Sequence, residues 1–289
     1  MDNRDRLLRI AVQSKGRLHE DTMSLLRETG IRVDEGKRTL LEKARNFPVE
    51  VLYLRDDDIP QCVANGVADL GIVGSNEFEE RGEEASVLRP LGFSKCRLSL
   101  AIPRSEDYTG LAWFNGRKIA TSYPAILRRF LSESGIRAEV HVITGSVEVS
   151  PGIGLSDAIF DIVSSGSTLV TNNLREVEAV MECEAILIAN KHIGQDKRAL
   201  IDELLFRIEA VMNAQDKKYV LMNVPSESLD AVVSVLPGAK SPTVMPLATK
   251  GWNSVHTVIE EKSLWGIIGK LKERGAQGIL VVPIEKMIL

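Results

Sequence analysis

Short apolar runs alternate with amphipathic helical spacing along most of this 289-residue chain. In the first part we predict strands at 7–13, 49–54 and 70–73 and helices at 20–28 and 58–64. Asp58 is expected to cap the second of these helices, because Pro60 follows in its first turn. An alternation of apolar strands and helices is typical of an α/β fold with a largely parallel sheet.

A second α/β stretch begins near residue 96. Its strands are predicted at 96–102, 118–121, 139–143 and 158–163, and its helices at 124–134 and 169–179. A return strand at 184–188 and a long amphipathic helix at 197–215 follow. We therefore expect two α/β lobes around a cleft, with the chain leaving the first lobe near residue 95 and returning near 185.

The pattern changes after residue 217. Strands are predicted at 219–223, 244–247, 254–259 and 278–283, and helices at 229–236 and 264–274. This βαββαβ order is that of a ferredoxin-like domain. The expected domains are thus lobe I at 1–95 and 185–217, lobe II at 96–184, and a third domain at 218–289.

Composition narrows the class of protein. Lys plus Arg number 36 and Asp plus Glu number 40, so the formal net charge is −4, and sequence-independent nucleic-acid binding is not expected. The cysteines Cys62, Cys96 and Cys183 are widely spaced, which argues against a disulfide framework or zinc knuckle and favours the cytoplasm. The four histidines lack metal-ligand spacing, no run of 18 apolar residues occurs, and the charged N-terminus does not resemble a signal peptide.

The segment 145–169 contains the strongest chemical signal. A predicted apolar strand is followed by Ser164, Ser165, Gly166, Ser167 and Thr168 and then by a helical pattern. Backbone N–H groups and hydroxyls in such a turn are suited to binding a phosphate. The upstream acids Glu148, Asp157 and Asp161 suggest that the phosphate belongs to a ribose. The alternative is a serine-rich loop that only caps a helix.

Several motifs in order carry a family resemblance. The chain contains KGRL at 15–18, RDDDIP at 55–60, DLGIVG at 69–74, ATSYP at 120–124, the segment from Glu148 to Leu169, and LVVPIEKM at 280–287. Together they resemble the ATP phosphoribosyltransferase family in its long form. That resemblance implies a two-lobed, periplasmic-binding-protein-like catalytic region and a C-terminal ferredoxin-like regulatory domain.

The family resemblance also implies a reaction. Adenine N1 of ATP attacks the anomeric carbon of phosphoribosyl pyrophosphate (PRPP), pyrophosphate leaves with inversion, and N1-(5-phosphoribosyl)-ATP forms as the first step of histidine biosynthesis. Mg²⁺ accompanies the pyrophosphate as cofactor. Histidine is expected to inhibit by binding the C-terminal domain, and the chain is expected to form homo-oligomers, as dimers and hexamers.

Site residues follow from the matched positions. Arg38 and Arg55 match arginines that meet the triphosphate or pyrophosphate, and Arg17 is a further candidate for the anionic groups. Glu148 and Asp161 match the acids that hold the PRPP ribose. By the same resemblance, equivalents of Asn223, Thr243 and Gly278 lie around the histidine pocket, although some relatives have an acid where this chain has Asn223.

Competing interpretations remain open at this point. The acids Asp56, Asp57 and Asp58 could bind magnesium, but helix capping is the simpler explanation, so no protein metal site is predicted. Two lobes around a cleft also suit a solute-binding or sensor module. A nucleotide-salvage phosphoribosyltransferase is less consistent with the sequence, because Asp157 and Asp161 are not adjacent.

Overall fold

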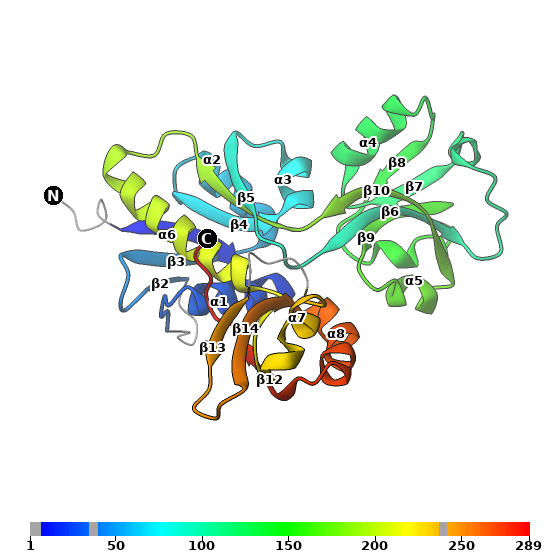
Figure 1. Ribbon diagram of the computed structural model, residues 1–289. Helices are drawn as coiled ribbons and strands as arrows, with labels where there is room; N and C mark the ends of the chain where they lie inside the picture. Colours follow the sequence, from blue (N-terminus) through cyan, green and yellow to red (C-terminus); the bar gives the residue numbers. More distant parts are fainter. Residues whose placement is uncertain (1–6, 35–39, 237–241) are drawn as a thin grey trace. The chain divides into compact units, whose positions relative to one another are not determined.

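The computed structural model describes residues 7–34, 40–236 and 242–289 (Figure 1). The chain divides into two compact units, Met1–Ile201 and Asp202–Leu289. The division falls inside helix α6 (Gln195–Ala214), which is earlier in the chain than the expected boundary at 217.

The first unit contains a six-stranded sheet in the order β2-β3-β1-β4-β11-β5. Its strands are β1 (Leu8–Gln13), β2 (Leu41–Lys43), β3 (Val49–Leu54), β4 (Leu70–Gly74), β5 (Ala85–Pro90) and β11 (Ala185–Asn190). Strands β1, β3 and β4 are parallel, whereas β2, β11 and β5 are paired antiparallel. Its helical segments are α1 (Arg17–Glu28), η2 (Asp56–Asp58), α2 (Ile59–Ala64) and α3 (Ser75–Arg81).

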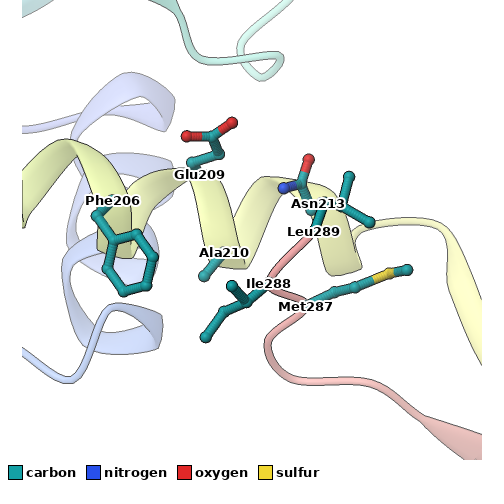
Figure 2. Close-up of a pocket in the computed structure, with 7 residues that line it drawn as sticks. All are labelled: Phe206, Glu209, Ala210, Asn213, Met287, Ile288 and Leu289. Carbon is teal, nitrogen blue, oxygen red and sulfur yellow. The ribbon is translucent and has the colours of Figure 1, made fainter.

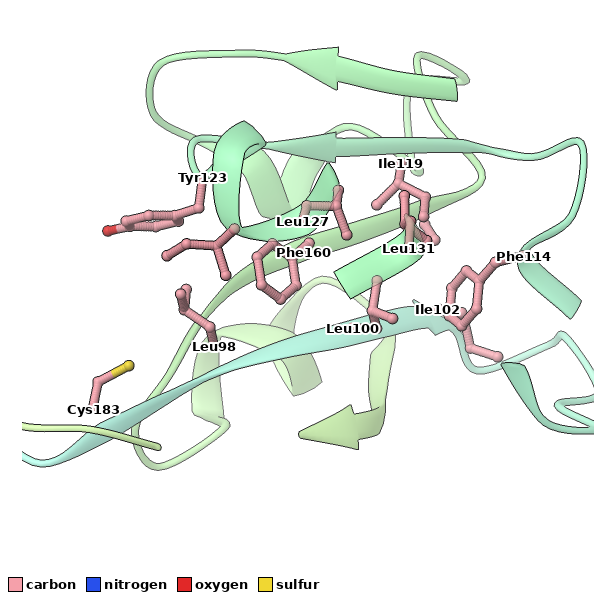
Figure 3. Close-up of a cluster of buried hydrophobic side chains, with 12 residues drawn as sticks. Leu98, Leu100, Ile102, Phe114, Ile119, Tyr123, Leu127, Leu131, Phe160 and Cys183 are labelled. Atoms are coloured by element: carbon pink, nitrogen blue, oxygen red, sulfur yellow. The ribbon is translucent and has the colours of Figure 1, made fainter. Parts of the chain in front are cut away.

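A five-stranded sheet in the order β10-β6-β9-β7-β8 follows in the same unit. Its strands are β6 (Cys96–Pro103), β7 (Lys118–Thr121), β8 (Glu139–Val142), β9 (Ala158–Val163) and β10 (Leu174–Cys183). Its helical segments are η3 (Leu111–Phe114), α4 (Pro124–Glu133), η4 (Val147–Val149) and α5 (Ser167–Thr171). Strands β7, β8 and β9 are parallel, and a buried cluster that includes Phe114, Tyr123, Leu127 and Phe160 packs on this sheet (Figure 3).

The predicted helix at 169–179 is wrong. Helix α5 ends at Thr171, and β10 begins at Leu174. Two register shifts in β10 break the alternation of a regular strand, so Val177, Val180 and Met181 all pack against the core. Within the predicted range, Val170, Leu174 and Val177 are spaced by four and three residues, which resembles a helical period and explains the error.

Two shorter features also differ from expectation. Strands β2 and β5 are not predicted by the apolar pattern. Asp58 does occupy the N-cap position of α2, but its side chain makes no capping hydrogen bond. The helix instead begins as a continuation of the 3₁₀ turn η2, with Pro60 in its first turn.

The second unit confirms the ferredoxin-like order. Its elements are β12 (Lys217–Pro225), η5 (Ser226–Ser228), α7 (Leu229–Val233), β13 (Thr243–Pro246), β14 (Trp252–Glu260), α8 (Glu261–Glu273) and β15 (Gln277–Pro283). The strands form an antiparallel sheet in the order β13-β14-β12-β15. Val220, Met222 and Val224 of β12 pack with side chains of α7 and α8, so both helices cover one face of the sheet.

The C-terminal residues of the second unit lie against α6. The amide of Met287 donates to the carbonyl of Ala210 at 2.8 Å. Ile288 and Leu289 line a hollow together with Phe206, as Figure 2 shows. In the described part of the chain, no helix is long and apolar enough to cross a membrane.

Gly71 of β4 tests how tightly the first sheet packs against α2. A Cβ at this position would lie 2.8 Å from a methyl carbon of Ile59 and 2.8 Å from one of Val63. We expect Gly71→Ala to lower the free energy of unfolding by about 1–3 kcal/mol through overpacking. Thermal unfolding checks this by a lowered midpoint.

Gly266→Ala is the matched control, because Gly266 lies in helix α8 and a Cβ added there would meet no atom within 4 Å. Alanine favours the helix, so the control should leave the midpoint unchanged or raise it. An unchanged midpoint in Gly71→Ala would contradict the packing described for β4.

Candidate functional site

The parallel strands of the first sheet place three segments at one edge. Arg17 begins α1 after β1, Arg55 follows β3, and Ser75 begins α3 after β4. The carboxyl ends of parallel strands are where α/β proteins bind ligands. This edge therefore carries two of the predicted arginines.

The second sheet repeats this arrangement. The carboxyl ends of β7, β8 and β9 lead to Tyr123, to Glu148 in η4, and to the loop 164–168. The predicted acids and the predicted phosphate loop therefore share an edge, although they are separated in sequence.

The loop 164–168 has exposed hydroxyls and a left-handed turn. The side chains of Ser164, Ser165, Ser167 and Thr168 are exposed, and Gly166 has φ +78°. The Ser165 and Ser167 hydroxyls lie 3.0 Å apart, and the Ser167 amide donates to Ser165 Oγ at 3.4 Å. Because α5 has only five residues, the donors that this turn presents are its hydroxyls and backbone amides rather than a long helix dipole.

Arg17 connects the two lobes at this loop. Its Nη1 donates to Ser164 Oγ at 3.4 Å, and its Nε lies 3.8 Å from Asp21 Oδ2. The guanidinium remains largely exposed and available to an anion. The structure thus brings Arg17 together with the predicted phosphate loop.

Glu148 and Asp161 also lie close enough to interact. Burial raises the pKa of Asp161 to about 6, and the negative charge of Glu148 adds to this effect. A hydrogen bond from the Ile162 amide (2.8 Å) acts in the opposite direction. Asp157 is placed differently, because its carboxylate accepts from the Lys118 amide at 2.8 Å and so holds the start of β7.

Arg55 is held by an acidic neighbour. Its side chain is 77% exposed, and it pairs with Asp57 at 3.2 Å, which also pairs with Arg81 at 3.2 Å. Asp57 therefore orients arginines at the sheet edge.

In the described ranges, no group of three or more His, Cys, Asp or Glu side chains is placed to hold a metal ion. Arg38 lies outside the described residues.

An ion pair behind the loop was missed from sequence. Arg97 of β6 pairs with Glu176 of β10, and its Nη1 lies 3.5 Å from the carbonyl oxygen of Ser164. Ser99 donates to the same glutamate at 2.8 Å. The charged positions on β6 are visible in the sequence, but the partner Glu176 falls in the stretch that the apolar spacing predicts as a helix.

Buried polar groups join α3 to the start of α4. The Tyr123 hydroxyl donates to Glu77 at 2.8 Å and accepts from the Asn76 amide at 3.1 Å. Burial raises the pKa of Glu77 and, together with the Glu77 charge, that of Tyr123. The Glu80 carboxylate accepts from the amides of Ala125 and Ile126, and thus caps α4 from the other lobe. Tyr123 is therefore a core and interlobe residue.

The predicted effector residues lie on the exposed part of the C-terminal sheet. Asn223 of β12 is paired with Ser254 of β14, and Thr243 of β13 is paired with His256. By strand alternation these side chains share the face opposite α7 and α8. A Cβ on Gly278 would lie 3.3 Å from Asn223 Nδ2, so Gly278 and Asn223 are also neighbours.

Sequence comparison assigns both parts of the chain. Residues 55–210 match the family HisG, described as ATP phosphoribosyltransferase, and residues 214–286 match the HisG C-terminal domain. An ATP phosphoribosyltransferase of Phocaeicola vulgatus is 68% identical, and one of Bacteroides fragilis is 67% identical. Each alignment covers 98% of this chain and 100% of the relative.

Solved structures agree on the fold. A chain in the ATP phosphoribosyl transferase (HisG:HisZ) complex from Thermotoga maritima superposes on this chain with a TM-score of 0.61 and is 27% identical to it. The match covers 70% of this chain and 96% of that one. A Bacillus subtilis protein described as a probable amino-acid ABC transporter extracellular-binding protein has a TM-score of 0.50 at 13% identity. The match covers 72% of this chain and 92% of that one, and it shows the fold alone.

Fold and comparisons together define a transferase with a two-lobed, periplasmic-binding-protein-like catalytic region. The chain belongs to the ATP phosphoribosyltransferase family, in the long form with a C-terminal domain. It transfers the 5-phosphoribosyl group from PRPP to N1 of ATP and releases pyrophosphate, the first step of histidine biosynthesis. The solute-binding alternative is therefore wrong.

The pKa of Asp161 predicts an acid limb in the pH profile. If ionised Asp161 accepts hydrogen bonds from substrate, protonation removes an acceptor, so kcat/KM for PRPP should fall as pH drops through about 6. In Glu148→Gln the neighbouring charge is lost, and the limb should move to lower pH. Initial rates between pH 5 and 8 measure both profiles.

PRPP itself also ionises, and its ionisation affects the profile of every variant equally. Asp161→Asn therefore serves as the control. The limb assigned to Asp161 should be absent from its profile. An identical limb in Asp161→Asn and the parent would contradict the assignment.

Proposed function

We propose that the loop 164–168 binds the 5-phosphate of PRPP while Glu148 and Asp161 hold its ribose hydroxyls. The observation that supports this most strongly is their common edge: β8 leads to Glu148, and β9 carries Asp161 directly before the loop. The exposed hydroxyls and the left-handed Gly166 offer donors to a phosphate, and the two carboxylates offer acceptors to a diol.

Arg17 and Arg55 then offer positive charge to the anionic groups of the donor. Both extend from the carboxyl edge of the first sheet, and Arg17 already contacts the loop. A guanidinium group can bind two phosphate oxygens at once, and it neutralises their charge as the bond between the anomeric carbon and pyrophosphate breaks. We assign pyrophosphate stabilisation to Arg55, and the same role for Arg38 rests on the sequence resemblance.

The chemistry requires little acid–base assistance from the protein. Adenine N1 has a lone pair in the plane of the ring, so no strong base is needed to prepare the nucleophile. Pyrophosphate is a good leaving group, and positive charge develops on the ribose as it departs. Positioning of the two substrates and stabilisation of charge therefore supply most of the rate.

Mg²⁺ fits this site as part of the substrate. Magnesium is commonly held by substrate phosphates and water with only one or two protein carboxylates. The described residues contain no cluster for a resident metal ion, whereas Glu148 and Asp161 are two carboxylates beside the proposed ribose position. We propose that PRPP enters as its magnesium complex, in which the ion neutralises pyrophosphate charge.

Arg55→Ala tests the assignment at the pyrophosphate end. Loss of a charge-stabilising donor should lower kcat roughly 10²–10³-fold. The assay combines ATP, PRPP and Mg²⁺ and follows the absorbance of the N1-substituted adenine. A kcat within a few-fold of the parent would remove Arg55 from the mechanism.

Arg45→Ala is the matched control. Arg45 is similarly exposed and pairs with Asp34, but it lies near the amino end of β3, at the opposite edge of the sheet. Its kcat should match that of the parent, so a general effect of removing a surface arginine is separated from loss of the pyrophosphate contact.

The C-terminal domain is proposed to bind histidine as a feedback inhibitor. Asn223, Thr243 and Gly278 are exposed, and Asn223 and Gly278 are neighbours across β12 and β15. The amide of Asn223 and the hydroxyl of Thr243 can pair with the polar groups of an amino acid. Glycine at 278 leaves room beside Asn223 that a larger residue would fill.

Asn223→Ala should raise the histidine concentration that gives half inhibition by about tenfold, the effect of losing one well-made polar contact of roughly 1.4 kcal/mol. Its kcat without histidine should be unchanged, because the residue lies outside the catalytic region. Activity of the parent chain that does not respond to millimolar histidine would contradict the proposal.

Assembly and location are proposals of the same kind. The chain is expected to form homo-oligomers, dimer to hexamer, and to work in the cytoplasm. Assembly is supported by exposed apolar residues on the same sheet face as Asn223, namely Leu280 (61% exposed), Val282 and Met245. Sizing with and without histidine measures the state directly.

A further inference from the structure

Two cysteines lie opposite each other on neighbouring strands. Cys96 is the first residue of β6, Cys183 is the last of β10, and the antiparallel register pairs them directly. Opposed residues in an antiparallel pair have Cα atoms about 4.5–5.5 Å apart, which lies within the roughly 4.4–6.8 Å that a disulfide spans. Both are free thiols in this structure.

The pair marks the place where the chain passes between the lobes. It leaves the six-stranded sheet after β5 and enters the other sheet at Cys96, then leaves at Cys183 and returns at β11. Glu184 adjoins this point and accepts from the amides of Ser75 (2.9 Å) and Gly92 (2.9 Å). Figure 3 shows Cys183 beside Leu98, at one end of the core of lobe II.

The two thiols differ in a way that suits stepwise oxidation. Cys96 is partly exposed, whereas Cys183 is 4% exposed. The neighbouring Cys183 thiol lowers the pKa of Cys96, with help from the positive charge of Arg17 and against the effect of burial. The same thiol contact, together with burial, raises the pKa of Cys183. Cys96 is therefore the attacking thiol and Cys183 the resolving one.

We propose that Cys96 and Cys183 are a redox-modification site, which forms a cross-strand disulfide at the lobe junction and thereby reversibly slows the enzyme. Residues on both sides of this junction contact each other, as Arg17 does with Ser164 and Glu77 with Tyr123. Both cysteines belong to the five-stranded sheet, at the points where the two connections to the other sheet begin. A covalent link there fixes these two connections to each other and restrains the twisting that a rotation between the lobes requires.

A low-molecular-weight disulfide is the oxidant for this step. The Cys96 thiolate attacks one of its sulfurs, the oxidant's S–S bond breaks, and one thiolate leaves. Cys183 then loses its proton and attacks the Cys96 sulfur, which expels the second thiolate. Two electrons and two protons pass from the protein to the oxidant, and a dithiol reductant reverses the reaction.

The test treats the full chain with oxidised glutathione and measures activity, free thiols and peptide links by mass spectrometry. We expect one Cys96–Cys183 link, loss of two thiols, a several-fold loss of kcat/KM, and recovery with dithiothreitol. Stable glutathionylation of Cys96 without the link, or a complete link with unchanged activity, would overturn the proposal.

Variants separate this site from other oxidation. Cys62→Ser should behave as the parent, because Cys62 lies away from the pair and burial raises its pKa. Cys183→Ser and Cys96→Ser should each keep their activity through the treatment. If either variant loses activity as the parent does, the Cys96–Cys183 link is not the cause of the loss. If Cys183→Ser folds poorly, mapping of the link in the parent decides the question.

Discussion

Parallel strands place the segments that follow them along one edge of a sheet, and this constraint organises the catalytic region. Two sheets each supply such an edge. The first carries arginines, and the second carries a hydroxyl-rich loop and two acids. The Arg17 contact to Ser164 joins the two sets across 147 positions of sequence. A substrate with a phosphate at one end, a diol in the middle and pyrophosphate at the other matches that order of groups.

Groups behind the site keep its edges in place. Arg97 and Glu176 pair beneath the start of the loop, and the Glu80 carboxylate caps α4 from the other lobe. The Tyr123 hydroxyl donates a second interlobe hydrogen bond, to Glu77. Each is a charged or hydrogen-bonded group with a satisfied partner, so breaking one leaves a costly unpaired atom. The chemistry itself requires mainly position and charge, which this scaffold provides.

Much of the fold was predictable because strand and helix periods in the sequence are regular. The strand β9, the helix α6 and the βαββαβ order of the last domain all follow from apolar spacing. Strand β10 was not predictable in this way, because the apolar residues Val170, Leu174 and Val177 have helical spacing and two bulges interrupt the strand's alternation. Glu176 and its partner Arg97 were lost with it. The loop 164–168 was found because serine and glycine are local signals, whereas the interlobe partners of Tyr123 depend on tertiary contacts that spacing does not encode.

A crystal structure of the chain with PRPP and Mg²⁺ tests the central claim most directly. The account predicts the 5-phosphate within the loop 164–168, the ribose hydroxyls on Glu148 and Asp161, and the pyrophosphate toward Arg55. PRPP bound with its 5-phosphate at another edge of the sheets, and the loop unoccupied, would contradict it.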